Sequence, residues 1–401
     1  MERDPALDGL RGLAVLMVFI FHYGGGQKST DSFVHLIGIL TEACWVGIVL
    51  FFALSGFLIT GSLWDSIGQK HRLRNFYSRR ALRILPLYFA ALLAAAVFSV
   101  ARGTTFAELK PLLLYVFFLQ DLPHLSAIAA QYTSSLPIYH LWTLAVEEQF
   151  YLIWPLILLF AHSRRHAVRL SLWFFWSTVL FLVAVYALPA FAAARGNHIY
   201  DQFLFTHSAA LALGAAVCLA MGNRASPTGR KPGSHRVIRK WATPAFFIGI
   251  AIFLYTSHHG QSFYLNAPIQ FWLGLPAISI TAAASIPIVL RTGIPRKIFS
   301  FAPLGWIGRI SYGFYIFHIL LQPLYDALAT RVVHTSSGNE YQLARLIIAF
   351  PITIAVSWLS FHLFESPILS LKRYLPMRQE LPWGEPVAPS RHTRRRRRSS
   401  S

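Results

Sequence analysis

The chain has 401 residues, of which 55% are hydrophobic and only 13% are charged, and its mean hydropathy is +0.49. This composition excludes an ordinary soluble domain, in which about a quarter of the residues are charged. Two cysteines, Cys44 and Cys218, are too few for a disulfide framework or a zinc site. The net charge of +20 would suit nucleic acid, but its distribution along the chain indicates membrane topology instead, so no nucleic-acid partner is expected.

Ten apolar segments nearly free of charge are predicted to be membrane-spanning helices. They lie near residues 10–25, 44–63, 80–101, 138–161, 170–192, 202–221, 241–257, 267–290, 304–328 and 344–364. An eleventh run at 112–120 is too short to cross and is predicted to be interfacial or re-entrant. The expected fold class is therefore an all-α integral membrane protein, a bundle of about ten transmembrane helices.

Lys and Arg are distributed unequally between alternate loops. The side that holds both termini has 27 of them, and the opposite side has five. The positive-inside rule then places both termini in the cytoplasm, and the expected location is the cytoplasmic membrane of the cell. The first span follows the polar start MERDPALDGLRG without a small-residue cleavage signature, so we expect a retained helix and not a signal peptide.

Two regions differ in composition. Residues 1–375 are predicted to form one transmembrane domain, and residues 376–401, which end in RHTRRRRRSSS, a disordered basic cytoplasmic tail. The arginine run either contacts anionic lipid head groups or only adds topological charge.

Ionisable residues inside spans usually mark a functional path. In ALDGLRGLAVLMVFIFHY, the residues Asp8, Arg11 and His22 share one helix face, because eleven residues return to within about 20° of the starting direction. The axial distance from Arg11 to His22 is about 16 Å, so one elongated ligand could reach both. The alternative for His22 is a histidine that only satisfies hydrogen bonds between helices.

The third span opens with FYSRRALRILPLY, in which Arg79, Arg80 and Arg83 lie together at the cytoplasmic end. Guanidinium groups bind phosphate in a bidentate way, which suits a phosphorylated ligand. Ordinary positive-inside charge is the alternative.

The fourth span, HLWTLAVEEQFYLIWPL, holds two adjacent glutamates. His140, Glu147 and Tyr151 lie on one face at offsets of 7 and 11, whereas Glu148 points about 100° away. One site is therefore expected to use Glu147 and not Glu148. A glutamate paired with an arginine for packing is the alternative.

Further candidates lie in two other spans. Ser55 is in FFALSGFLI, and GRISYGFYIFH places Gly308, Ser311, Tyr315 and His318 along one stripe. Such a stripe favours close helix contact and interhelical hydrogen bonds, and this packing role is expected for Ser311 and Tyr315.

These elements occur in a characteristic order: LDGLRGLAVLMVFIFH, FFALSGFLI, FYSRRALRILPLY, HLWTLAVEEQFYLIWP, ISYGFYIFH and FESP. The set resembles the acyltransferase-3 family of bacterial integral-membrane O-acyltransferases, from about residue 4 to 375. The resemblance implies transfer of an acyl group, commonly acetyl from acetyl-CoA, to a hydroxyl. Acceptors in the family include cell-surface and exported polysaccharides, lipopolysaccharide and macrolides.

The resemblance also implies roles for individual residues. His22 corresponds to the family's essential histidine and Glu147 to its fourth-helix glutamate, and both are expected to be catalytic. The arginines would hold the CoA phosphates: Arg11, Arg79, Arg80 and Arg83. Histidine suits a general base because its pKa lies near working pH, and Glu147 would orient the imidazole or activate the acceptor. No metal is expected.

The predicted function is transfer from acyl-CoA to a cell-surface or exported glycan, with the lipid bilayer, acyl-CoA and the glycan as partners. O-acylation of a small secondary metabolite such as a macrolide is an alternative. An alternative from another class is a proton-coupled transporter or flippase, in which the buried His and Glu form a proton relay. Direct transfer and a covalent acyl-histidine both remain open.

Overall fold

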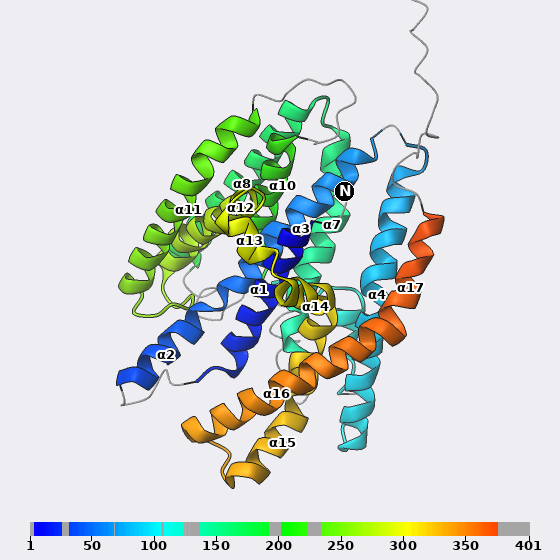
Figure 1. Cartoon of the computed structure of the whole chain (residues 1–401), viewed down its shortest axis with the longest axis vertical. Helices are drawn as coiled ribbons and strands as arrows, with labels where there is room; N and C mark the ends of the chain where they lie inside the picture. The colour runs from blue at the N-terminus through cyan, green and yellow to red at the C-terminus, as the bar shows by residue number, and fades with distance from the viewer. Residues whose placement is uncertain are drawn as a thin grey trace, which may run out of the picture.

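The computed structural model of the chain describes residues 4–25, 32–67, 69–105, 108–123, 125, 128, 137–191, 202–222 and 234–375. Within these ranges the regular structure is entirely helical, and no strand occurs (Figure 1). The predicted all-α class is confirmed. The segment 376–401, predicted to be a disordered tail, lies outside the described residues.

The helices follow one another along the whole chain. They are α1 (Pro5–Tyr23), α2 (Ser32–Ala43), α3 (Val46–Asp65), α4 (Arg72–Ala101), α5 (Leu112–Val116), η1 (Tyr139–Leu141), α7 (Trp142–Leu159), α8 (Arg164–Ala187), η2 (Pro189–Phe191), α10 (Leu204–Met221), α11 (Ser234–His259), η3 (Gln270–Gly274), α12 (Leu275–Val289), α13 (Ile294–Phe299), α14 (Ala302–Leu320), α15 (Gln322–Val333), α16 (Gly338–Ser360), η4 (Phe361–Glu365), α17 (Ser366–Ser370) and η5 (Leu371–Tyr374).

The described part contains seven helices long and apolar enough to cross a membrane, or eight if α14 and α15, which meet at a 60° bend, form one broken span. Each of the ten predicted segments coincides with a helix, but α7 and α11 are not among these candidates. The pair Glu147 and Glu148 lowers the hydropathy of the 18-residue α7, and two histidines end α11. Seven or eight spans are therefore supported, and the count of ten remains a prediction, as does the side on which each terminus lies.

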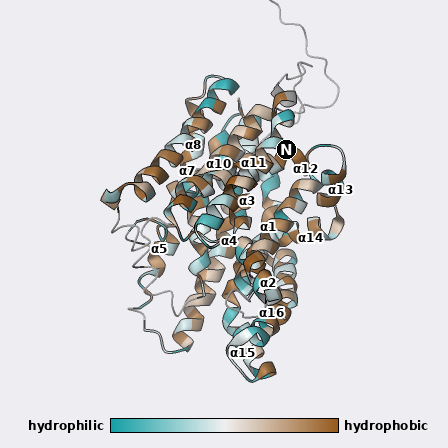
Figure 2. Cartoon of the chain, turned by 90° about the vertical axis from the view of Figure 1, so that its left-hand side faces the viewer, coloured by the Kyte–Doolittle hydropathy of each residue, from teal (hydrophilic) through white to brown (hydrophobic). Residues whose placement is uncertain are grey.

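Large apolar side chains are exposed on the surface of the protein. Figure 2 colours the ribbon by residue hydropathy, and hydrophobic residues (brown) lie along the outer helices. Trp173 and Trp176 on α8 are 73% and 61% exposed, and Leu180, one turn further along, is 70% exposed. Burying a side chain of this size stabilises by about 1.5–3 kcal/mol, which in this arrangement only lipid could supply. The fold is that of a multi-pass membrane protein.

Two glycine crossings bring the central helices into close contact. α1 packs on α14, and α3 packs on α10. A Cβ at Gly308 of α14 would lie 1.8 Å from the Asp8 carbonyl oxygen, and one at Gly56 of α3 would lie 1.9 Å from the Leu211 oxygen. Only glycine permits such backbone approaches, so the close contact predicted for the Gly308 stripe is present.

Local sequence signals begin the helix that bears Arg11 and His22. The Asp4 carboxylate accepts a hydrogen bond of 3.0 Å from the Ala6 amide, and Pro5 occupies the first helical position, where its missing N–H costs nothing. α1 thus starts at a defined residue, which fixes the direction of every later side chain on it.

Candidate active site

A cavity of about 100 Å³ lies between α1, α3, α4, α7 and α14. Its lining includes most of the side chains that the sequence singled out: Arg11, Ser55, Arg80, Arg83, Glu147, Tyr151, Ser311 and Tyr315. These residues come from positions 11 to 315 of the chain, so the fold has gathered motifs that are far apart in sequence.

Positive charge dominates the cavity. Arg11, Arg80 and Arg83 contribute guanidinium groups, against Glu147 as the carboxylate among its described lining residues. Arg11 is partly neutralised by Asp8, whose carboxylate lies 3.7 Å away. The Arg80 guanidinium lies 5.2 Å from the centre of the Tyr151 ring, within the range of a cation–π interaction. The remaining excess of cationic groups suits an anionic ligand.

Glu147 is held in the cavity by a short hydrogen-bonded chain. The Tyr151 hydroxyl donates to Glu147 Oε2 at 3.0 Å, and the Ser55 and Tyr151 hydroxyls are hydrogen-bonded to each other. Glu148 is outside the cavity lining, and its Oε1 contacts no protein donor in the described part of the chain. The predicted division between the two glutamates is therefore present, because 100° of helix rotation separates them.

Arg79 differs from the other arginines of its motif. Its Nη1 donates to the carbonyl oxygens of Lys372 at 3.1 Å and Leu375 at 2.8 Å, and it does not line the cavity. In this structure Arg79 ties α4 to η5 at the end of the described chain. A role for Arg79 in CoA binding remains a prediction.

Three histidines lie together outside the cavity lining. The ring of His318 on α14 lies 5.1 Å from that of His22 on α1 and 5.2 Å from that of His140 on η1, measured between centroids. We call these three residues the histidine cluster. His22 Nδ1 lies 2.8 Å from the Val18 carbonyl oxygen and must be its donor, which leaves the lone pair of Nε2 available.

The expected pairing of His22 with Glu147 is not formed. The described contacts of His22 are with Val18, Phe21, Tyr139 and His318. Glu147 lies seven residues after His140, which is about 10 Å along the helix axis. It accepts a hydrogen bond from Tyr151 instead. Glu147 therefore does not contact the imidazole that it was expected to orient.

A hydroxyl pair connects the cavity to the histidine cluster. The Tyr315 hydroxyl lies 2.6 Å from Thr143 Oγ1 and 2.5 Å from the His140 carbonyl oxygen. Tyr315 and Thr143 both line the cavity, so its far end lies against the backbone of His140.

The sequence analysis missed Thr143 and Tyr312. Tyr312 lines the cavity, and its hydroxyl donates a hydrogen bond of 2.6 Å to the carbonyl oxygen of Ile84, the residue that follows Arg83. Both residues lie inside motifs quoted above. Tyr312 is one helical turn before Tyr315, and Thr143 is four residues before Glu147. Among the described residues, no group of three or more His, Cys, Asp or Glu side chains is arranged to hold a metal ion.

The fold and the cavity define a class, a multi-pass membrane protein with a buried cationic ligand site. Residues 4–362 match the family model described as an acyltransferase domain, so the chain belongs to this family of acyltransferases.

Among curated proteins, the chain is 28% identical over 381 residues to the peptidoglycan O-acetyltransferase OatA of Listeria monocytogenes. It is 27% identical over 382 residues to YrhL of Bacillus subtilis, whose name assigns the same activity provisionally. Both alignments cover 91% of this chain but only 55% and 54% of the relatives. The chain thus spans about half the length of these relatives. No solved structure matches it.

Proposed function

We propose that the chain is a membrane-embedded O-acyltransferase that moves an acyl group, expected to be acetyl, from acyl-CoA to a hydroxyl of a cell-surface or exported glycan at the inner membrane. The observation that carries this proposal is the cavity in which Arg11, Arg80 and Arg83 surround one carboxylate between membrane helices. Membership of an acyltransferase family and relatives named for acetylation of peptidoglycan, a glycan, support it.

The donor fits the cavity by charge, and the volume of the cavity limits which part of the donor can enter it. Acyl-CoA carries phosphates that guanidinium groups recognise. A space of about 100 Å³ is too small for a whole nucleotide-bearing molecule, since pockets for drug-sized ligands span roughly 300–1,000 Å³. The phosphates would therefore stay with the arginines, and the thioester arm would extend past Tyr315 toward the histidine cluster. The roughly 16 Å between Arg11 and His22 along α1 is the length that this arm has to span.

The chemistry requires a base and a stabilised oxyanion. As the acceptor hydroxyl oxygen bonds to the thioester carbonyl carbon, His22 Nε2 takes the hydroxyl proton. The C–S bond then breaks, and the departing CoA thiolate takes this proton from the imidazolium. Hydrogen-bond donors fixed by the fold would stabilise the charge that develops on the carbonyl oxygen.

The test uses the full chain in lipid nanodiscs with labelled acetyl-CoA and soluble peptidoglycan fragments. Label should pass to the glycan, and His22→Ala should reduce transfer by at least about 100-fold, the smaller end of the range for a general base. Protein level and membrane insertion should not change. Near-normal transfer by this variant would contradict the role of His22.

The same assay separates an enzyme from a transporter. A transporter would leave acetyl-CoA intact, whereas the proposed enzyme consumes it and labels the acceptor. In cells, loss of the gene should lower acetylation of surface glycan relative to the parent strain.

A further inference from the structure

The histidine cluster holds more nitrogen atoms than the transfer reaction uses. One base is enough to take the hydroxyl proton, and His22 supplies it. His318 and His140 are 0% and 3% exposed. Burial of a polar group without a partner costs about 1–3 kcal/mol, so a fold that retains two such imidazoles needs a reason for them.

The unpaired atoms of these two residues can be identified. His318 Nδ1 lies 2.5 Å from the Tyr315 carbonyl oxygen and donates to it, which leaves Nε2 as an acceptor without a protein partner. Neither ring nitrogen of His140 makes a hydrogen bond of ordinary geometry in the described ranges, although the backbone of Tyr315 and Ile316 lies near its ring. A neutral imidazole has one N–H and one lone pair, so His140 offers a donor and an acceptor together.

This set of atoms matches hydroxyl groups. A hydroxyl donates one hydrogen bond and accepts up to two, which is what an imidazole acceptor beside an imidazole donor requires. A lone alcohol would satisfy only His22, whereas a sugar presents a neighbouring hydroxyl as well. A metal ion is not favoured, since no described group is arranged to hold one.

We propose that His318 and His140 form a binding subsite for a second hydroxyl of the acceptor, next to the hydroxyl that His22 activates. The proposal rests on the proposed function and specifies its acceptor as a molecule with neighbouring hydroxyls, such as a sugar. His318 Nε2 accepts from that second hydroxyl, and His140 donates to it.

The subsite is accessible from one edge. His22 is half-buried, and Tyr139, whose ring lies 6.2 Å from that of His22, is 42% exposed. The opposite edge borders the cavity at Tyr315, whose ring lies 5.1 Å from that of His140. Acceptor and donor would thus reach the histidines from different sides.

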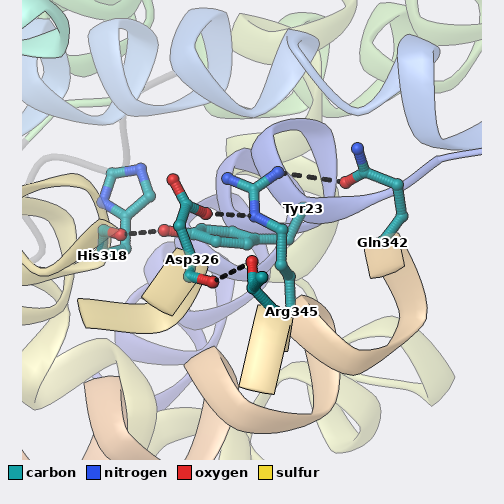
Figure 3. Close-up of polar contacts among 6 residues, drawn as sticks. Tyr23, His318, Asp326, Gln342 and Arg345 are labelled. Carbon is teal, nitrogen blue, oxygen red and sulfur yellow. Dashed lines mark hydrogen bonds and ion pairs between the residues drawn. The ribbon is translucent and has the colours of Figure 1, made fainter. Parts of the chain in front are cut away.

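A polar network holds the cluster together from behind (Figure 3). The Tyr23 hydroxyl donates to the carbonyl oxygen of His318, which ties the end of α1 to α14. The Arg345 guanidinium lies 5.2 Å from the centre of the Tyr23 ring, with its Nε 2.6 Å from Asp326 Oδ1. Gln342 accepts a further bond of 3.0 Å from Arg345. His22 immediately precedes Tyr23 in the chain, so the network fixes the position of His22 relative to His318.

The experiment compares variants that remove only the unpaired nitrogens. In His318→Asn the amide can keep the bond to the Tyr315 carbonyl while the Nε2 lone pair is lost. In His140→Phe the ring packing remains and both nitrogens are lost. The matched control is His362→Asn, because His362 Nδ1 makes the same kind of bond to the Trp358 carbonyl, at 2.9 Å, on an exposed surface.

Each variant is measured as full chain in nanodiscs with labelled acetyl-CoA and the disaccharide N-acetylglucosamine–N-acetylmuramic acid. We expect the KM for the disaccharide to rise about tenfold in both cluster variants, while the KM for acetyl-CoA stays within about twofold. That rise corresponds to about 1.4 kcal/mol, within the range for losing one hydrogen bond to a buried group. His362→Asn should behave as the unchanged chain, and His318→Gln, whose amide can reach the Nε2 position, should recover part of the affinity.

The outcomes separate this inference from the proposed function. Transfer by the unchanged chain with no change of disaccharide KM in either cluster variant overturns the subsite and leaves the function standing. An equal rise in the KM for acetyl-CoA also overturns it, because the cluster would then serve the donor. No transfer by the unchanged chain overturns both. Should one variant fail to fold, as judged by thermal unfolding, the other decides.

Discussion

The cavity and the histidine cluster are both buried and polar, yet they are built differently. The cavity contains three guanidinium groups and one carboxylate, whereas the cluster contains imidazoles with unpaired nitrogens and is braced by an ion pair behind it. Charged groups suit a charged ligand, and uncharged donors and acceptors suit a neutral one. Under the proposed function, this difference keeps the anionic donor and the neutral acceptor apart until they react.

The variant pair that should separate the two regions most strongly is Glu147→Gln and Glu148→Gln. Glu147→Gln removes the charge that faces the arginines and weakens the bond from Tyr151, so we expect kcat to fall about 10- to 100-fold, since a hydrogen bond to a charged group contributes about 1.5–3 kcal/mol. Glu148→Gln changes the same charge outside the cavity and should leave kcat within a few-fold. Equal losses in labelled-acetyl transfer would show that charge inside the membrane, and not position in the cavity, matters.

A second pair divides the basic motif of α4. Arg83→Gln should raise the KM for acetyl-CoA about 10- to 100-fold, since a hydrogen bond to a charged group contributes about 1.5–3 kcal/mol. Arg79→Gln should change this KM little, because the Arg79 guanidinium binds backbone carbonyls of η5. Neither variant should change the KM for a glycan acceptor. A larger effect at Arg79 would reverse the assignment of the phosphate-binding groups.

A third pair acts on both regions together. Gly308→Ala would place a Cβ 1.8 Å from the Asp8 carbonyl oxygen and push α1 from α14, whereas a Cβ at Gly305 has no neighbour nearer than 3.9 Å, the Pro5 oxygen. Gly308→Ala should lower the free energy of unfolding by about 1–3 kcal/mol. It should also weaken the binding of both substrates, since the cavity and the histidine cluster both use α1 and α14. Gly305→Ala should be neutral or stabilise slightly, and thermal unfolding in detergent compares the two.

The smallest effect is expected behind the cluster. Tyr23→Phe removes the hydroxyl that donates to the His318 carbonyl. Loss of this hydrogen bond, which contributes about 1 kcal/mol, should raise the KM for the acceptor a few-fold without altering the KM for acetyl-CoA. Tyr325→Phe removes a hydroxyl from the same layer that bonds to Thr353 at 2.9 Å, not to His318, and serves as the control. If both variants changed the acceptor KM equally, Tyr23 would have no specific positioning role.

Helical periodicity predicted the members of the cavity but not their partners. Arg11, Arg83 and Glu147 could be found because an ionisable residue within an apolar run stands out, and a 100° step per residue separates Glu147 from Glu148. The three-dimensional neighbours depend on how different helices pack, which a single helix does not encode. His22 was therefore assigned to Glu147, while the structure places it beside His318.

Arg345 illustrates a second kind of omission. In sequence it reads as one charge near the start of an apolar helix, and nothing there points to Tyr23, more than 300 residues earlier. Its ion pair with Asp326 depends on the 60° bend between α14 and α15, which brings α15 back against α16. Pro323 at the start of α15 marks the break in the helix, but the angle of the bend follows from tertiary packing.

The seven-residue spacing from His140 to Glu147 runs from η1 directly into α7 and sets the distance between the cluster and the cavity. Because the first belongs to the cluster and the last to the cavity, their separation and relative angle are fixed by a count of residues and not by the packing of neighbouring segments. Inserting a single residue between them would turn the downstream face by about 100°, so that Val146 would take the place of Glu147 and Glu147 that of Glu148. The chain can therefore exchange many of its outward-facing apolar side chains freely, but it cannot change length here without losing its alignment.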